Sequence, residues 1–96
     1  MTALKQYTRL ESLGLWRADQ KAQRREVAVC FGDATLIIRD TANRPLTHWS
    51  LPAIERLNPN EVPALFAPDD SGDETLEIDD ELMIEAIEKV RKALAK

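Results

Sequence analysis

The last part of the chain, from Asp79 to about Ala95, constrains the fold most, because it has the pattern of a single amphipathic helix. Acidic residues gather in its first turns and basic residues in its last, as the helix dipole favours, and we expect Asp79 to be the N-cap. A lone helix of this length is marginal in water, so its apolar face is expected to pack on a sheet. That face comprises Met83, Ala86, Ile87, Val90, Ala93 and Leu94.

Before the helix, short alternating segments are separated by turn residues, which is typical of antiparallel strands. The clearest is a hairpin of segments 27–31 and 35–39, joined by a turn at Gly32 and Asp33. Pro63 interrupts the segment 62–67, and we expect an edge or bulged strand there because proline cannot donate to a sheet ladder. The seven expected strands cover residues 10–17, 27–31, 35–39, 46–51, 53–57, 62–67 and 75–78.

The chain has 96 residues, so we expect one domain, 1–96, with one modest core. Seven strands followed by one helix indicate a mainly β (α+β) fold, and this order resembles the pleckstrin-homology-like (PH-like) fold, in particular its small bacterial modules. The resemblance implies a bent seven-stranded antiparallel barrel with the C-terminal helix covering one open end. The alternatives are another small β-barrel with an appended helix, or an α+β sandwich with the helix across one open sheet.

The segment between the first two expected strands holds four basic residues, Arg17, Lys21, Arg24 and Arg25. The resemblance implies that this loop gathers cations around a phosphorylated lipid headgroup. Cations that converge on a phosphate make strong, charge-assisted hydrogen bonds. Weak binding of an anionic ligand through these four residues is therefore one expectation. The alternative is a solvated loop whose charges keep a sheet edge from pairing with another chain.

Charge is distributed unevenly along the chain. Residues 69–88 include ten acidic and no basic residues, whereas residues 1–26 include six basic and three acidic ones, so we expect a bipolar molecule. A net charge of −4 argues against nucleic-acid binding, which needs a basic face. The acidic turn 69–74 is not a calcium loop of the EF-hand type, because its glycine stands fourth and not sixth.

The inventory of catalytic groups is small. His48, the single histidine, has no nucleophile and orienting acid in a local motif, and we expect it at a partly exposed sheet position. Cys30 lies in an apolar strand, where we expect a thiol in the core with a raised pKa. No glycine-rich phosphate loop and no HExxH or CxxC motif is present. We therefore predict a non-enzymatic chain without a cofactor or metal.

The apolar runs, the single cysteine and the surfaces of the predicted fold indicate the cellular context and the partners. No apolar run approaches the ~20 residues that span a bilayer, and a lone cysteine fits the reducing cytoplasm. We expect a protein-interaction or accessory module that meets a protein partner or a second copy through a sheet edge, the segment 63–68 or the acidic surface. The alternatives are an anionic-ligand binder, for a lipid headgroup or phosphate, and an N-terminal regulatory domain of a longer membrane-associated protein.

Overall fold

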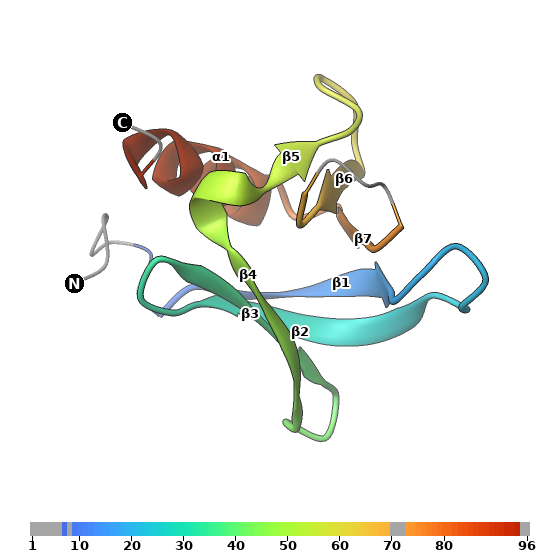
Figure 1. Cartoon of the computed structure of the whole chain (residues 1–96). Helices are drawn as coiled ribbons and strands as arrows, with labels where there is room; N and C mark the ends of the chain where they lie inside the picture. The colour runs from blue at the N-terminus through green and yellow to red at the C-terminus, as the bar shows by residue number, and fades with distance from the viewer. Residues whose placement is uncertain (1–6, 8, 70–72, 95–96) are drawn as a thin grey trace.

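The computed structural model describes residue 7, residues 9–69 and residues 73–94. It shows a curled antiparallel sheet of seven strands with one C-terminal helix, so the predicted mainly β architecture and its element order are confirmed (Figure 1). The strand order across the sheet is β4-β3-β2-β1-β7-β6-β5. The elements are β1 (Glu11–Arg17), β2 (Arg25–Phe31), β3 (Thr35–Asp40), β4 (Pro45–Ser50), the 3-10 turn η2 (Leu51–Ala53), β5 (Glu55–Arg56), β6 (Ala64–Ala67), β7 (Thr75–Ile78) and the helix α1 (Glu81–Leu94).

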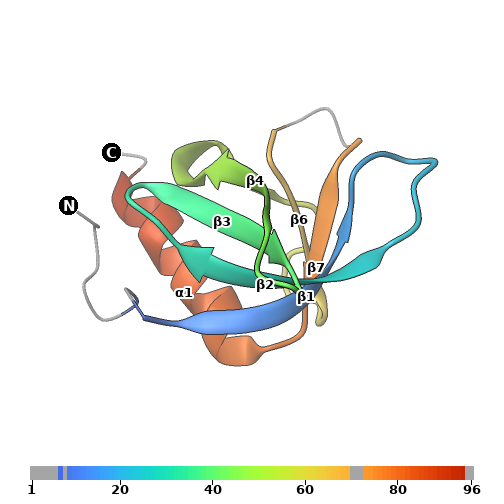
Figure 2. The same ribbon diagram turned by 90° about the horizontal axis from the view of Figure 1, so that it is seen from below.

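The two halves of the sheet meet at β1. This strand pairs with β2 along most of its length, and its last three residues also pair with β7. Gly14 stands where the second pairing begins, and a Cβ there would lie 2.9 Å from the carbonyl oxygen of Glu77. The missing side chain lets β7 approach, which is a common use of glycine where a sheet bends sharply. Figure 2 shows the resulting half-barrel, with α1 on one side of it.

The inner side of the half-barrel holds the core. Alternate residues of each strand point inward, so that β2 contributes Val27 and Val29 and β3 contributes Leu36 and Ile38, all fully buried. From the other half, Phe66 on β6 meets the buried residues of β7. Because α1 packs against η2 and β7, the helix closes the core where the sheet does not.

The helix differs from the expectation at both ends. Its N-cap is Asp80 and not Asp79, because Oδ1 of Asp80 accepts hydrogen bonds from the backbone N–H groups of Leu82 (3.0 Å) and Met83 (3.2 Å). At the other end Ala93 is exposed, so its predicted place in the buried stripe was wrong. The buried face comprises Met83, Ile84, Ala86, Ile87 and Val90, with Leu94 partly buried. No helix in the described part of the chain has the length and apolar character to cross a membrane.

Two strand predictions needed correction. The segment 53–57 was expected to be a strand, but Leu51–Ala53 forms a turn of 3-10 helix with Pro52 near its start, and only Glu55–Arg56 pairs with β6. The expected edge strand around Pro63 was also wrong. Pro63 precedes β6, and β6 lies between β5 and β7, so its amides are needed on both sides.

Candidate interaction surface

The structure does not gather the four basic residues of the β1–β2 loop around one point. Arg24 extends to β7, where its Nη1 lies 2.6 Å from Oε2 of Glu77. Nη2 of Arg25 instead lies 4.0 Å from Oδ2 of Asp40, at the end of β3. Residues that follow each other in an extended chain point to opposite faces, so these two guanidinium groups diverge. Anionic-ligand binding through this loop stays a prediction.

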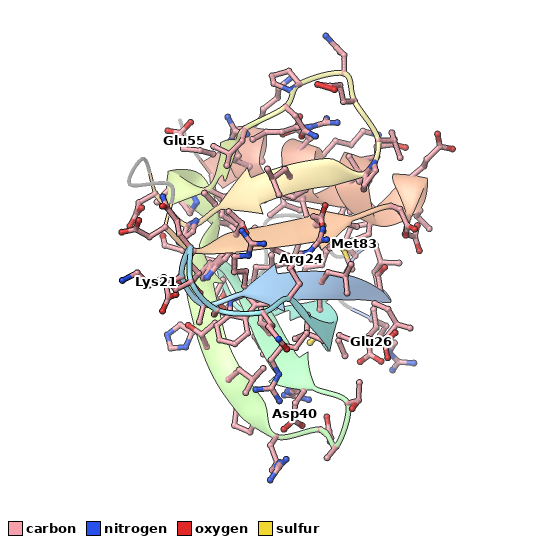
Figure 3. The ribbon with its side chains drawn as sticks, turned by 90° about the vertical axis from the view of Figure 1, so that its right-hand side faces the viewer. Lys21, Arg24, Glu26, Asp40, Glu55 and Met83 are labelled. Atoms are coloured by element: carbon pink, nitrogen blue, oxygen red, sulfur yellow. The ribbon has the colours of Figure 1, made fainter. Side chains whose placement is uncertain are left out.

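The other two basic residues lie apart from this pair. Lys21 is exposed near the tip of the loop, and Figure 3 shows it well separated from Arg24. A hollow of about 320 Å³ beside Lys21 is also lined by the carboxylates of Asp19 and Asp73. Arg17 is half-buried, with an Nε that has no hydrogen-bond partner among the described residues. The acidic side chains at the loop make the local electrostatic potential less positive, which weakens the attraction of the loop for an anion.

The pairing of β1 with β7 also bears on the charge distribution. It brings the acidic segment of the sequence beside the basic one, and the ion pair of Arg24 and Glu77 joins the two. Opposite charges are therefore adjacent here, which departs from the bipolar molecule that we expected from the sequence.

The outer face of β1 carries the most exposed apolar group of the sheet. Leu13 and Leu15 have 57% and 42% of their surface exposed, while their neighbour Trp16 points inward and packs against the core. Alternation along a strand places both leucines on the same side. Two large apolar side chains are thus adjacent in space and are not used by the domain's own core.

Carboxylates surround these leucines. Cross-strand pairing places Glu26 on β2 and Glu77 on β7 on either side of Leu15. Continuing the same register puts Asp79 beside Leu13, and Glu11 comes two residues earlier on the same face of β1. Glu77 is paired with Arg24, but Glu11, Glu26 and Asp79 have no cationic partner among the described residues. We call these three residues with Leu13 and Leu15 the β1 surface.

Two shallow hollows flank the β1 surface. One, of about 380 Å³, is lined by Glu11, Ser12, Leu13, Asp79 and Asp80. The other, of about 280 Å³, is lined by Leu15, Arg24, Pro63, Glu77 and Asp79. Asp79 lines both, so the hollows are neighbours along one strip of surface between β1 and the start of α1. Such a strip can receive apolar side chains together with cationic ones.

Cys30 does not lie in the core, contrary to the expectation. It shares the outer face with Ala28 and is only half-buried, because Val29 and Phe31 take the inward positions of β2. The predicted direction of its pKa is confirmed. Burial raises the pKa of the Cys30 thiol, Glu11 adds to the effect, and the positive charge of Arg39 opposes it.

His48 is exposed on the outer face of β4, opposite Ile37 of β3. Within the described ranges, no three histidine, cysteine or acidic side chains lie close enough together to hold a metal ion. The absence of a catalytic function stays a prediction.

Comparison of the chain with protein-family models, with curated proteins and with solved structures finds no match.

The β1 surface was not identified from the sequence, although its signal is present there. The sequence shows Leu13 and Leu15 in one phase and Trp16 in the other, but not which phase points to the core. Ser12 and Gly14 share the phase of Trp16, and small residues are no signal of an inner face. The close approach of β7 at Gly14 and the burial of Ser12 show that the small residues face inward.

Proposed function

We propose that this chain is a non-catalytic protein-interaction module on a PH-like barrel, and that the β1 surface is where it binds its partner. The observation that carries the proposal is the pair of exposed leucines beside Glu11, Glu26 and Asp79, three carboxylates without a cationic partner in the part of the chain that the structure describes. A partner suited to this surface presents apolar side chains together with lysine or arginine.

The order of elements supports the PH-like assignment. Seven antiparallel strands in one curled sheet, followed by a C-terminal helix, match the element order that the resemblance implies. The fold says little about the partner, because the same barrel can serve many functions.

Burial of the leucines would supply the apolar part of the binding energy. Complete removal of a leucine side chain from water is worth about 1.5–3 kcal/mol, and Leu13 and Leu15 have roughly half of that left to gain. The carboxylates add orientation and a faster encounter with a cationic partner rather than much affinity. They also disfavour a second copy on this face, because two copies would bring like charges together.

The test compares two double variants of the full chain. In the first, Leu13→Ser and Leu15→Ser remove the proposed contact. In the control, Leu57→Ser and Leu82→Ser remove two leucines of similar exposure, 44% and 54%, from other surfaces. Each protein is immobilised and used to retrieve partners from a lysate, and the affinity for the retrieved protein is then measured with purified components.

We expect the wild type and the control to bind the same protein and the Leu13/Leu15 variant to lose most of this binding. Binding should also weaken as salt is raised, because salt screens exposed charges. Equal binding by both double variants would place the contact elsewhere. Failure of the wild type to retain any protein would count against an interaction module.

A further inference from the structure

The two edge strands of the sheet differ in how well they are protected against pairing with a strand of another chain. At one edge, β5 has only two residues, both charged, and Arg56 pairs with Glu88 of α1. At the other edge, β4 has six residues and none is charged. Figure 3 shows β4 as the outermost strand on its side of the sheet. Natural proteins protect an exposed edge by making it short, by charging it, or with a proline or a bulge. On β4 the proline (Pro45) and the register shift in the pairing with β3 lie at the start of the strand, so the rest of it, residues 47–50, has no such protection.

The hydrogen bonds of β4 show which backbone groups face away from the sheet. The N–H of Leu51 donates to the carbonyl of Ala34 at 3.1 Å, which fixes the phase of the β3–β4 ladder. In an antiparallel pair, alternate residues bond to the neighbouring strand. Trp49 therefore bonds to β3, while His48 directs its amide and carbonyl groups outward. Ser50 directs its amide outward, and its carbonyl faces the first turn of η2, of which Ser50 is the N-cap. Both residues are exposed, and the two outward amides and the carbonyl of His48 have no hydrogen-bond partner among the described residues.

A hollow of about 520 Å³ lies on the outer face beside this edge. Its lining includes Gly32, Thr35, Ile37, Pro45 and His48. Gly32 helps keep it open, since a Cβ there would come within 2.6 Å of Oγ1 of Thr35 and 2.9 Å of Cδ1 of Ile37. A strand added to β4 would place alternate side chains on this face, where one long apolar side chain could reach Ile37.

We propose that β4 is a second docking site, which binds an extended segment of a partner protein as an additional antiparallel or parallel strand. The outward amides of His48 and Ser50 and the outward carbonyl of His48 supply the backbone hydrogen bonds, and the hollow takes one large apolar side chain of the segment. The segment needs no charge, because β4 has none. The site goes beyond the β1 surface, and it lies on a different strand at the edge of the sheet.

A second copy of this chain is a poorer occupant of the hollow. Its own β4 would present Pro45, His48 and Ser50 on the outer face, none of which is a long apolar side chain. The partner segment is therefore expected to come from another protein.

A pair of substitutions at Ser50 tests the backbone contact directly. The φ angle of Ser50 is −73°, which is within the range of proline, so Ser50→Pro fits the observed backbone. Its N–H points away from β3, and the substitution therefore removes an outward donor without breaking the sheet. Ser50→Ala is the matched control, because it removes the same hydroxyl and retains the N–H.

The probe is a display library of random linear peptides selected against the immobilised wild-type chain. We expect the enriched peptides to share a large apolar residue, to bind Ser50→Ala like the wild type, and to bind Ser50→Pro about tenfold more weakly. Amide hydrogen exchange followed by NMR should show that His48 and Ser50 become protected when peptide is added. The Leu13/Leu15 double variant should bind these peptides normally, which separates this site from the β1 surface.

Circular dichroism first tests whether Ser50→Pro is folded. If it is unfolded, the hydrogen exchange of His48 and Ser50 in the wild type, with and without peptide, decides whether β4 is the binding site. The proposal is overturned if no peptide is enriched, if the peptides bind both Ser50 variants equally, or if protection appears away from β4. It is also overturned if the two amides are already protected without peptide in a concentration-dependent dimer, because the occupant would then be a second copy.

Discussion

Trp16 and Trp49 share a single hydrogen-bond acceptor, although they lie on strands that do not pair. The indole Nε1 of Trp16 donates to Oε2 of Glu74 at 2.8 Å, and that of Trp49 donates to the same oxygen at 3.0 Å. Trp16 is on β1, in the middle of the sheet, and Trp49 is on the edge strand β4. Glu74, just before β7, therefore ties the two together across the half-barrel, where the sheet itself has no backbone bonds.

We predict that Glu74→Ala destabilises the fold by about 2–4 kcal/mol, because it leaves the indole N–H groups of the partly buried Trp16 and the buried Trp49 without an acceptor. The free energy of unfolding in urea measures the effect. Glu61→Ala is the matched control, since the exposed carboxylate of Glu61 has no partner among the described residues, and its loss should change stability by less than about 0.5 kcal/mol. Equal effects of the two substitutions would show that the shared acceptor contributes little.

The elements predicted best from the sequence are those whose signal is local. The helix is specified by the spacing of Met83, Ile87 and Val90, and the β2–β3 hairpin by alternation around Gly32. The contact of Trp16 with Glu74 could not be predicted in this way, because it joins residues 58 positions apart. Such a contact depends on the curl of the whole sheet, for which no short segment carries a signal.

The candidate surfaces were predicted less well, for a related reason. Whether Leu13 points inward depends on how closely β7 approaches β1, which is a tertiary property. The exposed edge was anticipated in general terms, but it was placed near Pro63 and not at β4. The basic residues of the β1–β2 loop lie close together in sequence, but Arg24 and Arg25 extend to different carboxylates because consecutive residues of an extended segment face opposite sides.

Gly14→Ala should destabilise the domain by about 1–3 kcal/mol. The added methyl group would lie 2.9 Å from the carbonyl oxygen of Glu77 and 3.2 Å from Cδ1 of Leu76, and a backbone oxygen cannot move aside without disturbing the β1–β7 pairing. Ala28→Val adds apolar volume on the outer face of the adjacent strand and serves as the control. Thermal unfolding of the three proteins compares them, and a Gly14→Ala protein as stable as the wild type would contradict the close approach.

Substitutions at two neighbouring aspartates distinguish the observed N-cap from the expected one. Asp80→Ala should lower the free energy of unfolding by about 1 kcal/mol, because the N–H groups of Leu82 and Met83 lose their acceptor. Asp79→Ala should have a much smaller effect, since the side chain of Asp79 accepts no hydrogen bond from the described backbone. Urea denaturation of both variants is the measurement, and the reverse order of effects would restore Asp79 as the cap.

Ile87→Asp should destabilise the protein by several kcal/mol, which is a large part of the total stability of a domain of this size. Ile87 lies on the buried face of α1 with no exposed surface, so a carboxylate there would have no contact with water. Leu82→Asp introduces the same charge into the same helix at a position that is 54% exposed, and it should be tolerated. Circular dichroism at room temperature is sufficient, and a folded Ile87→Asp protein would mean that α1 does not cover the core.

Acid should destabilise the wild type in part through Asp40. Its Oδ1 accepts hydrogen bonds from the backbone N–H groups of Arg44 (2.8 Å) and Ala42 (3.0 Å), and its Oδ2 accepts one from Nε of Arg44 (2.8 Å). These bonds, that of the Arg44 backbone above all, lower the pKa of Asp40 below its ordinary value of 3.8. The ionised carboxylate therefore stabilises the folded state at pH values above about 4, and this contribution is lost as the pH falls through the lower pKa of the folded state.

Asp40→Asn tests this reasoning, because it removes the titrating group and keeps the shape of the side chain. We expect the variant to have a lower melting temperature than the wild type near pH 7 and a smaller further decrease on acidification below about pH 4. Glu61→Gln removes a carboxylate without such bonds and should follow the wild type through the same pH range. Parallel pH profiles for the wild type and Asp40→Asn would show that the hairpin between β3 and β4 does not depend on the charge of Asp40.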